Sequence, residues 1–461
     1  MACRICDMRM QIGAGWLWVE SGNGTSGTEP LDWGLRGEGA WAYAMGMISR
    51  PTMGASAFAA ACLMAGVLAL AAEDKAAVLT GAVGASPAVR AAILDVKGTG
   101  YRTAVTNGSV VVPVVVVGGT PYQMGWQFGQ WMRDEIRTFV PAVLAGFKKE
   151  LGVDDAVLDD VWAATAGHTD DRVEQEMLGV ANGAGLPVRM LQHAHCLPLL
   201  MPYSCSSIAA WGSATVDGHL YQTRNLDWSL EAGAHEFPVL LVRLPSEGRA
   251  HVTPTFAGVV GAHCGMNSAG IVLAEMGDSS RKEAPYAVHA PHFTTWFRTM
   301  LYDAGSLTEV MQVFQRQGQT KRYHFVFGDG LTERKAVKIR TDSRVRGTDR
   351  VQVWKDDDGS DELAPNVLSC VVYQDEGRGV FPRLQKARGK LDGPAMIEMA
   401  NSIPIKGGNV MNAVFDATAL RVWVSYARGQ EEAYQRPYVF LDLTTLDANR
   451  DGVPDFVAKP R

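Results

Sequence analysis

A cysteine followed by two short strand-like runs most constrains how this chain can fold. Cys205 opens the run CSSIAAWG, the turn Asp217-Gly218 follows, and a second apolar run ends at RNLDW, residues 224–228. Two such runs joined by an Asp-Gly turn are typical of a β-hairpin. The sequence therefore predicts one hairpin that brings a thiol close to a positive and a negative charge, Arg224 and Asp227.

The chemistry of a thiol nucleophile requires a base nearby, because the thiolate is the reactive form. None of the 10 histidines stands in a pattern that marks a Cys–His pair. Cleavage of the Ser204–Cys205 bond would supply a different base, since the new α-amino group would titrate at about 7.7–8.0 beside its own sulfur. We therefore expect Cys205 to become the N-terminus of a processed chain.

The same stretch resembles the Cys-type N-terminal-nucleophile hydrolases, in particular the penicillin (isopenicillin N) acyltransferase family and, more distantly, the choloylglycine hydrolases. These families carry a nucleophilic Cys, a small-residue strand, an Asp-Gly turn and then Arg-Asn-Leu/Phe-Asp-Trp/Tyr, as this chain does at 205–228. Three other segments are similar to the acyltransferase family, namely GTPYQMGWQFG at 119–129, EQEMLGVANGAG at 174–185 and GMNSAG at 265–270. The resemblance covers roughly residues 115–440.

The resemblance implies an α+β fold, a four-layer αββα sandwich of two antiparallel sheets between helix layers. It implies autocleavage into a light-chain segment, 73–204, and a heavy chain, 205–461. Cys205 would then form a thioester. Asp227 would hold the α-ammonium group or steer its proton, and Arg224 would hold Asp227 or polarise the substrate.

The chain departs from the family pattern at two points. Ser204 precedes the nucleophile where Gly is common in the family, and the family's Thr-Asn-His type strand is not intact in NVLSCVVY, 366–373. Asn366 in that stretch is the candidate oxyanion-hole donor. Arg383, in FPRL at 381–384, stands where the family has a Ser-x-Arg-like element.

Two more residues are candidates for the wall of a substrate pocket. Trp228 follows the charged pair directly, and Asn267 stands in the GMNSAG segment. Asn267 also suits a turn with a positive φ angle, which Asn tolerates. Both interpretations of Asn267 stay open at this point.

The N-terminal part calls for a separate interpretation. Residues 53–72 are apolar and end in small residues, with Arg50 just upstream, which is typical of a secretory signal peptide and also long enough for a membrane anchor. We expect 45–72 to be that signal or anchor, 1–44 to be an extension before the true start, and the protein to be exported. We predict no metal binding by the single CxxC motif at Cys3 and Cys6.

Partners and cofactors follow from charge and from the candidate chemistry. The net charge of −6 and the lack of a long basic run argue against nucleic-acid binding. His193 and His195 lack a third ligand, so no metal is predicted, and no other cofactor is expected. The expected partner is a small-molecule amide or an acyl-peptide, with no stable membrane partner unless the N-terminal segment is retained.

Apolar periodicity predicts alternating helices and strands. Val110–Val117, interrupted by Pro113, is expected to be an edge strand. Helices are predicted at 122–147, 170–184, 190–200, 294–303, 306–316, 380–390 and 393–401. Strands are predicted at 205–212, 219–223, 238–244, 251–257, 260–265, 270–276, 323–328, 335–341, 350–354, 367–373, 410–416, 420–425 and 437–442.

Some features of the sequence have less specific interpretations. Cys196, Cys264 and Cys370 are expected in the core or in disulfides. The segment 447–455 has some calcium-loop character but lacks the final glutamate, so we expect a polar turn.

Three functions are compatible with the sequence. The first is a self-processing amidohydrolase that cleaves a linear amide (an N-acyl amino acid, an acyl-peptide or a penicillin-type side chain) through a thioester. The second is an acyl-coenzyme A-dependent N-acyltransferase, and the third is a catalytically inactive secreted binding protein of the same fold. The sequence leaves the oligomeric state open.

Overall fold

The computed structural model describes residues 8–12, 15–19, 100–201, 204–277, 290–316, 320, 322–341, 351–374, 379–403, 407–447 and 456. Within the predicted extension 1–44 it describes only a hairpin of β1 (Met8–Ile12) and β2 (Gly15–Val19). The predicted signal or anchor, 45–72, and the turn after Asp447 lie outside the described residues. No helix in the described ranges is both long and apolar enough to span a membrane.

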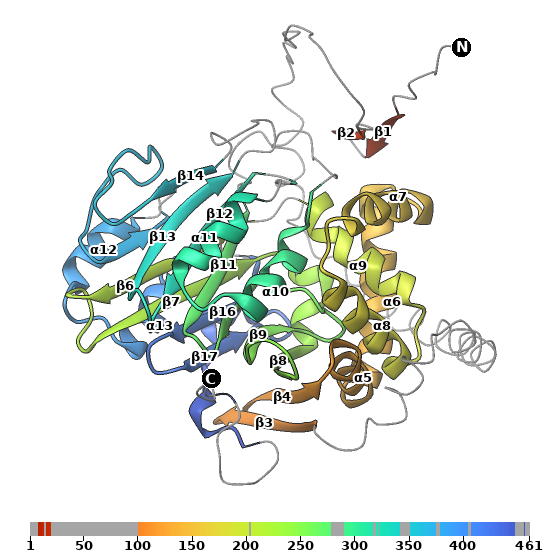
Figure 1. The fold of residues 1–461 in the computed structure, drawn as a ribbon, viewed down its shortest axis with the longest axis horizontal. Coiled ribbons are helices and arrows are strands. Elements are labelled where there is room, and N and C mark those ends of the chain that lie inside the picture. The colour runs from red at the N-terminus through yellow and green to blue at the C-terminus, as the bar shows by residue number, and fades with distance from the viewer. Residues whose placement is uncertain are drawn as a thin grey trace, which may run out of the picture. The chain divides into compact units, whose positions relative to one another are not determined.

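Two β-sheets form the centre of the part described from residue 100 onward (Figure 1). The first sheet has nine strands in the order β14-β13-β12-β11-β10-β9-β8-β4-β3, and all neighbours are antiparallel except the parallel pair of β4 and β8. Its strands are β3 (Tyr101–Asn107), β4 (Val110–Gly119), β8 (Pro238–Pro245), β9 (His251–Phe256), β10 (Cys264–Asn267), β11 (Ile271–Gly277), β12 (Tyr323–Asp329), β13 (Lys335–Thr341) and β14 (Val351–Trp354).

The second sheet has the order β15-β6-β7-β16-β17-β18, and the short strand β5 also pairs with β7. All of its pairs are antiparallel. Its strands are β5 (Ser204–Ser206), β6 (Ile208–Gly212), β7 (Gly218–Asp227), β15 (Val371–Tyr373), β16 (Asn409–Asp416), β17 (Arg421–Tyr426) and β18 (Val439–Asp442).

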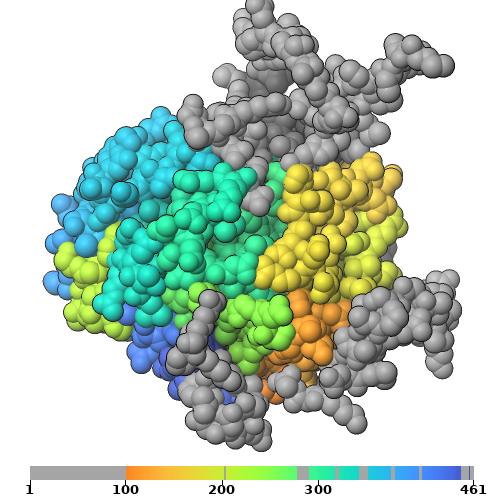
Figure 2. Space-filling model, viewed as in Figure 1, coloured from red at the N-terminus to blue at the C-terminus, as the bar shows by residue number. Residues whose placement is uncertain are grey.

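Helices come in three groups along the described chain. Five of them precede the second sheet: α5 (Pro121–Trp131), α6 (Arg133–Leu151), α7 (Asp155–Ala166), α8 (Asp171–Ala184) and α9 (Val188–Leu200). Two pairs follow: α10 (Phe293–Asp303) with α11 (Leu307–Arg316), and α12 (Val380–Ala387) with α13 (Gly393–Asn401). Figure 2 shows the first group, in yellow, beside the later strands and helices on one face.

The two sheets pack against each other, and α10 and α11 cover the other face of the first sheet. Phe297 of α10 and Phe314 of α11 contact Phe325 of β12, with ring centroids 5.7 and 5.4 Å away. Because side chains alternate along a strand, the neighbouring Val326 lies on the opposite face, where its carbonyl accepts a hydrogen bond from Gln222 of β7 at 2.9 Å.

The second sheet buries its outer face against α12 and α13. Ile208 of β6 and Val414 of β16 belong to one buried apolar cluster with Leu384 of α12 and Met396 of α13. This cluster is separate from the main core, which lies between the sheets, under the first helices and under α10 and α11. Both faces of each sheet are therefore covered along much of its length.

Helix α5 begins where the sequence supplies a capping box. The Thr120 hydroxyl accepts a hydrogen bond from the Gln123 amide at 3.3 Å, the Gln123 side chain accepts one from the Thr120 amide at 2.8 Å, and Pro121 occupies the first turn. This cap fixes the chain direction as it leaves β4.

Helices α5 and α8 cross closely because glycines face each other at the crossing. A Cβ on Gly179 would lie 2.2 Å from the Tyr122 carbonyl oxygen, and a Cβ on Gly125 would lie 2.1 Å from the Glu176 carbonyl oxygen. Real Cβ atoms do not come this near to backbone. Gly129 and Gly183 approach the facing helix in the same way, so these four glycines of the segments 119–129 and 174–185 are packing residues.

Four predicted elements differ from the structure. The strand predicted at 367–373 begins only at Val371, after a turn at Ser369 and Cys370. The strand at 110–117 is not an edge strand, because β4 pairs with β3 on one side and with β8 on the other. Pro113 is tolerated since the pairing with β8 begins only at Val114. The helix predicted at 122–147 is two helices that break at Met132 (φ −120°, ψ 26°), and the strand predicted at 260–265 begins only at Cys264.

Candidate functional site

The hairpin predicted around Cys205 is confirmed by the strand pairs. Cys205 lies in β5 and pairs with Leu226 of β7, while Ser204 pairs with Asp227. β6 continues from β5 and pairs with the same strand, β7. The Cys205 side chain is buried and its thiol is free.

The two predicted charged residues lie on opposite faces of the sheet beside Cys205. Directly opposed residues share a face and successive residues alternate, so Cys205, Leu226 and Arg224 point to one face and Ser204 and Asp227 to the other. The face of Cys205 is the one turned to the first sheet, because Arg224 contacts a residue of β11 there. The structure thus brings the thiol and both charges together at the start of β5.

Arg224 pairs with Glu275 of β11 across the space between the sheets. The distance from Nη2 to Oε2 is 3.5 Å, and both side chains are completely buried. Nη1 donates to the Asn225 carbonyl oxygen. Burial by itself would lower the pKa of Arg224, but the facing Cys205 and Glu275 raise it above its ordinary value, so this guanidinium is a permanent cation beside the thiol.

Glu275 is a functional candidate that the sequence reasoning did not find. It is the single acidic residue in the otherwise apolar strand IVLAEMG. A lone carboxylate inside a fully buried strand needs a partner, and this could have indicated a facing cation. The identity of that cation depends on how the two sheets face each other, which local patterns do not specify.

Burial raises the pKa of the Cys205 thiol to about 11 in the continuous chain, although Arg224 opposes the shift. The negative charges of Glu275 and Asp227 act in the same direction as burial. The thiol is therefore almost entirely neutral at pH 7, and its use as a nucleophile requires a base that removes its proton.

Asp227 is held by an asparagine on the next strand. Its Oδ1 accepts a hydrogen bond from Nδ2 of Asn409 at 2.8 Å, and Asn409 is its partner in the pairing of β7 with β16. Both side chains are buried. Asn409 was also missed by the sequence reasoning, where the only signal was a polar residue just before the strand predicted at 410–416.

Asn366 and Arg383 lie elsewhere. Asn366 is exposed, and its carbonyl oxygen accepts a hydrogen bond from the Tyr373 hydroxyl at 3.0 Å. Arg383 is exposed on α12 and donates to the Ser402 carbonyl oxygen at 2.7 Å. Neither of these contacts connects its side chain to Cys205, so the oxyanion-hole role of Asn366 stays a prediction.

The side chain of Asn267 is fully engaged with backbone groups. Nδ2 donates to the carbonyl oxygens of Leu301 and Ala304, and Oδ1 accepts from the amides of Ala269 and Ile271. The amide therefore braces the β10–β11 turn against the end of α10 and has no capacity left for a substrate. The structure favours a role in the turn, but the predicted positive φ angle is wrong for Asn267, which is the last residue of β10; the positive φ of this turn is at Gly270 (+72°).

Trp228 lies under a helix of the first group. Its ring stacks on Phe147 of α6 with centroids 5.4 Å apart and planes 6° apart, and its backbone amide donates to the Gly408 carbonyl oxygen at 2.6 Å. One face of the indole is thus covered by protein.

The other cysteines in the described ranges, together with His193 and His195, have ordinary structural positions. Cys196, Cys264 and Cys370 are free, so the disulfide alternative is wrong for them. His193 lies 2.8 Å from Asp159, and His195 accepts the amides of the loop before β10. In the described ranges no group of three or more His, Cys, Asp or Glu could hold a metal ion.

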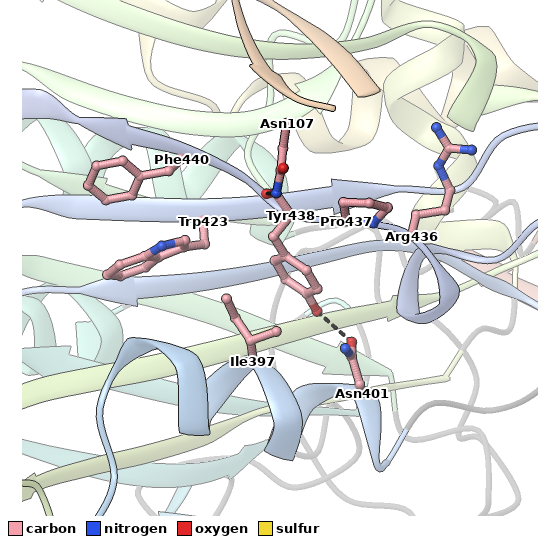
Figure 3. Close-up of a pocket in the computed structure, with 8 residues that line it drawn as sticks. All are labelled: Asn107, Ile397, Asn401, Trp423, Arg436, Pro437, Tyr438 and Phe440. Atoms are coloured by element: carbon pink, nitrogen blue, oxygen red, sulfur yellow. Dashed lines mark hydrogen bonds between the residues drawn. The ribbon is translucent and has the colours of Figure 1, made fainter. Parts of the chain in front are cut away.

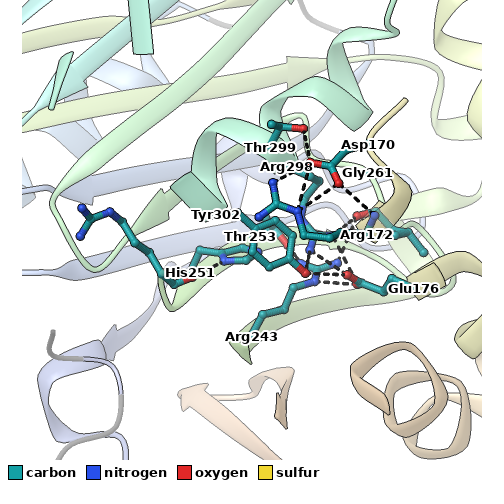
Figure 4. Close-up of polar contacts among 12 residues, drawn as sticks. Asp170, Arg172, Glu176, Arg243, His251, Thr253, Gly261, Arg298, Thr299 and Tyr302 are labelled. Carbon is teal, nitrogen blue, oxygen red and sulfur yellow. Dashed lines mark hydrogen bonds and ion pairs between the residues drawn. The ribbon is translucent and has the colours of Figure 1, made fainter. Parts of the chain in front are cut away.

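A second buried polar cluster surrounds Glu176 of α8 (Figure 4). Its carboxylate accepts from Nε of Arg243 on β8 and from Nη2 of Arg298 on α10, both at 2.7 Å. Burial by itself would raise the pKa of Glu176, but the two guanidinium groups hold it below its ordinary value. The cluster joins a helix before Ser204 to a strand and a helix after Cys205.

A shallow pocket of about 390 Å³ lies at the outer side of β17 and β18 (Figure 3). Trp423 and Phe440 form one wall, and the Tyr438 hydroxyl donates to Asn401 at 2.9 Å. Cys205, Arg224, Asp227, Glu275 and Asn409 are not among the residues that line this pocket.

Comparison with known proteins gives distant relatives. No protein-family model matches the chain. Protein dcd1B of Dictyostelium discoideum is 30% identical over 170 residues, which cover 32% of this chain and 33% of that protein. Protein dcd1A of the same organism is 23% identical over 395 residues, which cover 73% of this chain and 86% of that protein. The first match therefore spans about a third of the relative's length.

Several solved structures are weakly similar to the chain. They include the Caenorhabditis elegans ortholog of N-acylethanolamine-hydrolyzing acid amidase, with 14% identity, a TM-score of 0.36 and coverage of 51% of this chain and 100% of that one. Penicillin V acylase of Agrobacterium tumefaciens has 12% identity, a TM-score of 0.33 and coverage of 54% and 89%. A variant of the conjugated bile acid hydrolase of Clostridium perfringens has 8% identity, a TM-score of 0.35 and coverage of 55% and 99%. TM-scores in this range do not establish a shared fold.

Proposed function

We propose that this chain is a self-processing cysteine amidohydrolase of the N-terminal-nucleophile class, with the four packed layers forming an αββα sandwich. The observation that carries the proposal is the position of Cys205. The thiol lies against the Arg224 cation on one face of the sheet, while Asp227 lies beside the Ser204–Cys205 bond on the other. In this arrangement Arg224 would stabilise the Cys205 sulfur on one face, and Asp227 would hold the α-amino group of Cys205 from the other face.

The first reaction would be cleavage of the chain by its own thiol. The Cys205 sulfur attacks the Ser204 carbonyl carbon, the carbon–sulfur bond forms, and the peptide carbon–nitrogen bond breaks as the nitrogen takes up a proton. Water then hydrolyses the thioester, which releases the Ser204 carboxylate and restores the thiol. The product is a heavy chain with a free α-amino group on Cys205.

That amino group supplies the base that the continuous chain lacks. It would titrate at about 7.7–8.0, close to the optimum for a general base at neutral pH. It accepts the thiol proton, the thiolate attacks the amide carbonyl of the substrate, and the leaving amine takes the proton. Asp227 holds the α-ammonium form until the leaving amine takes its proton. Water then hydrolyses the thioester: its hydroxyl joins the acyl group and its proton returns to the Cys205 sulfur through the α-amino group.

The substrate would be a linear amide such as an N-acyl amino acid, an acyl-peptide or a penicillin-type side chain. We propose water as the acyl acceptor because we also propose that the protein is exported, where acyl-coenzyme A is scarce. The choice of water as the acyl acceptor and the proposed export are both supported by the sequence pattern alone.

The test is turnover of a panel of N-acyl amino acids and acyl-peptides by the purified chain, with trapping of the acyl-enzyme by mass spectrometry. We expect Cys205→Ala to abolish both turnover and the acyl adduct. Cys196→Ala is the matched control, since Cys196 is also a buried, free thiol, and it should keep both. An acyl adduct on another residue, or full activity of Cys205→Ala, would refute the proposal.

A further inference from the structure

The segment 407–409 is fixed by one buried carboxylate. Glu432 immediately precedes the short 3₁₀ helix η4 (Ala433–Gln435) and is buried. Its two oxygens accept hydrogen bonds from three consecutive amides, those of Gly407 at 3.0 Å, Gly408 at 3.1 Å and Asn409 at 2.9 Å. Hydrogen bonds to an ionised acceptor are stronger than neutral ones, so this carboxylate determines where the segment lies.

The fixed segment contacts the chain just after Asp227. The Gly408 carbonyl oxygen accepts the Trp228 amide at 2.6 Å, and a Cβ on Gly408 would lie 2.4 Å from the Trp228 carbonyl oxygen. Gly407 has a φ of +93°, which side chains other than glycine rarely adopt. The two glycines thus allow the segment to lie directly on the end of β7.

The orientation of the Asn409 amide is determined by its own contacts. Its Oδ1 accepts the Tyr434 backbone amide at 3.0 Å, which identifies that atom as the oxygen. Its Nδ2 must then face Asp227 Oδ1 and Asn412 Oδ1, both at 2.8 Å. The amide nitrogen is therefore committed as a donor to the Asp227 carboxylate.

We infer that Glu432 and Asn409 are positioning residues for Asp227: Glu432 fixes the backbone of 407–409, and Asn409 holds the Asp227 carboxylate beside the Ser204–Cys205 bond. This inference rests on the proposed function for its catalytic meaning. It predicts that the site depends on two residues that lie more than two hundred positions beyond Cys205 in the sequence.

Four titratable groups lie near Cys205 and affect its titration. Arg224 of β7 and Glu275 of β11 lie on its face of the sheet, Asp227 of β7 lies on the other face, and the neutral thiol of Cys264 belongs to β10. Replacing Asn409 by Asp adds a second carboxyl group at hydrogen-bond distance from Asp227. When both are ionised, the added negative charge disfavours the thiolate of Cys205, so its alkylation should require a higher pH.

The experiment compares Asn409→Asp, Glu432→Gln and the control Ser425→Ala in the full chain. Ser425 is completely buried and donates to the Ala433 carbonyl oxygen at 2.7 Å, so its loss weakens the same region without touching Glu432 or Asp227. Two quantities are measured for each variant. The first is the rate at which a chain beginning at Cys205 appears, and the second is the pH profile of iodoacetamide alkylation of Cys205, with Cys196 as the internal reference.

We expect Asn409→Asp and Glu432→Gln to slow self-cleavage about tenfold to a hundredfold, and Asn409→Asp to move the Cys205 profile up by about one pH unit. Ser425→Ala should leave both quantities near the wild-type values even if it melts at a lower temperature. Unchanged cleavage and an unchanged Cys205 profile in Asn409→Asp would overturn the inference, as would equal shifts of Cys205 and Cys196. If the wild-type chain never cleaves, the proposed function fails. The positioning role is then decided by whether Asn409→Asp shifts the alkylation pH profile of Cys205 and leaves that of Cys196 unchanged.

Discussion

The guanidinium of Arg224 and the carboxylate of Glu275 face each other between the two sheets, 3.5 Å apart and both completely buried. Arg224 comes from β7, which pairs with the strand of Cys205, and Glu275 comes from β11 of the other sheet. The cation beside the Cys205 thiol is thus neutralised from across the sheet interface. The same pair joins the two sheets at the candidate site.

Replacing Glu275 by Gln should destabilise the fold. Removing one partner leaves the other as an uncompensated buried charge, which typically costs about 3–5 kcal/mol. We expect the free energy of unfolding of Glu275→Gln, measured by urea denaturation, to fall by about 3 kcal/mol. Glu362→Gln is the control, because the Glu362 side chain is 68% exposed next to Arg340, and it should change stability by less than about 1 kcal/mol.

A pair of glycine substitutions should have opposite effects on stability. Gly179→Ala places a Cβ 2.2 Å from the Tyr122 carbonyl oxygen at the crossing of α5 and α8, so the helices must separate. Gly146→Ala places its Cβ in open space on α6, and alanine is favoured over glycine within a helix by about 0.5–1 kcal/mol. Thermal unfolding should show a clear decrease in melting temperature for Gly179→Ala and a small increase for Gly146→Ala. A neutral Gly179→Ala would contradict the close crossing.

Stability should fall as the solution becomes acidic, in part because of His195. Burial lowers the pKa of this imidazole to about 4, and its neutral Nε2 accepts the amides of Val260 and Gly261 at 3.0 Å. The unfolded chain binds this proton at about pH 6.5. The stabilisation is therefore complete above about pH 6.5 and is lost as pH falls toward about 4, by about 2–3 kcal/mol.

The contribution of His195 can be isolated with a substitution. In His195→Gln the difference in unfolding free energy between pH 7 and pH 4.5 should be smaller than in the wild type, because one buried proton site is gone. His168 is exposed, so His168→Asn should keep the full wild-type difference. An unchanged difference in His195→Gln would show that His195 does not couple folding to pH.

Local sequence patterns predicted the hairpin and most of the strands and helices. The Cys205 segment could be interpreted because its strands are neighbours in the chain, and a turn with Gly218 joins them. Helix α7 and strand β3 were missed, since neither has a strong apolar stripe: β3 is mostly exposed and α7 buries few of its residues. The break at Met132 is likewise absent from the apolar periodicity, which continues across it.

The second half of the candidate site depends on long-range pairing. Glu275 reaches Arg224 only because the two sheets face each other, and Asn409 reaches Asp227 only because β16 pairs with β7. No local pattern specifies either pairing. Asn366 was selected for its place along the chain, and the structure puts it on an exposed loop.

The most direct test of the account is the intact mass and N-terminal sequence of the purified protein, with Cys205→Ala prepared in parallel. The account predicts that the wild type contains a chain that begins at Cys205 and that Cys205→Ala stays uncut at this bond. A wild-type chain that runs unbroken through Ser204–Cys205 would contradict it, because the amino group proposed as the base would not exist.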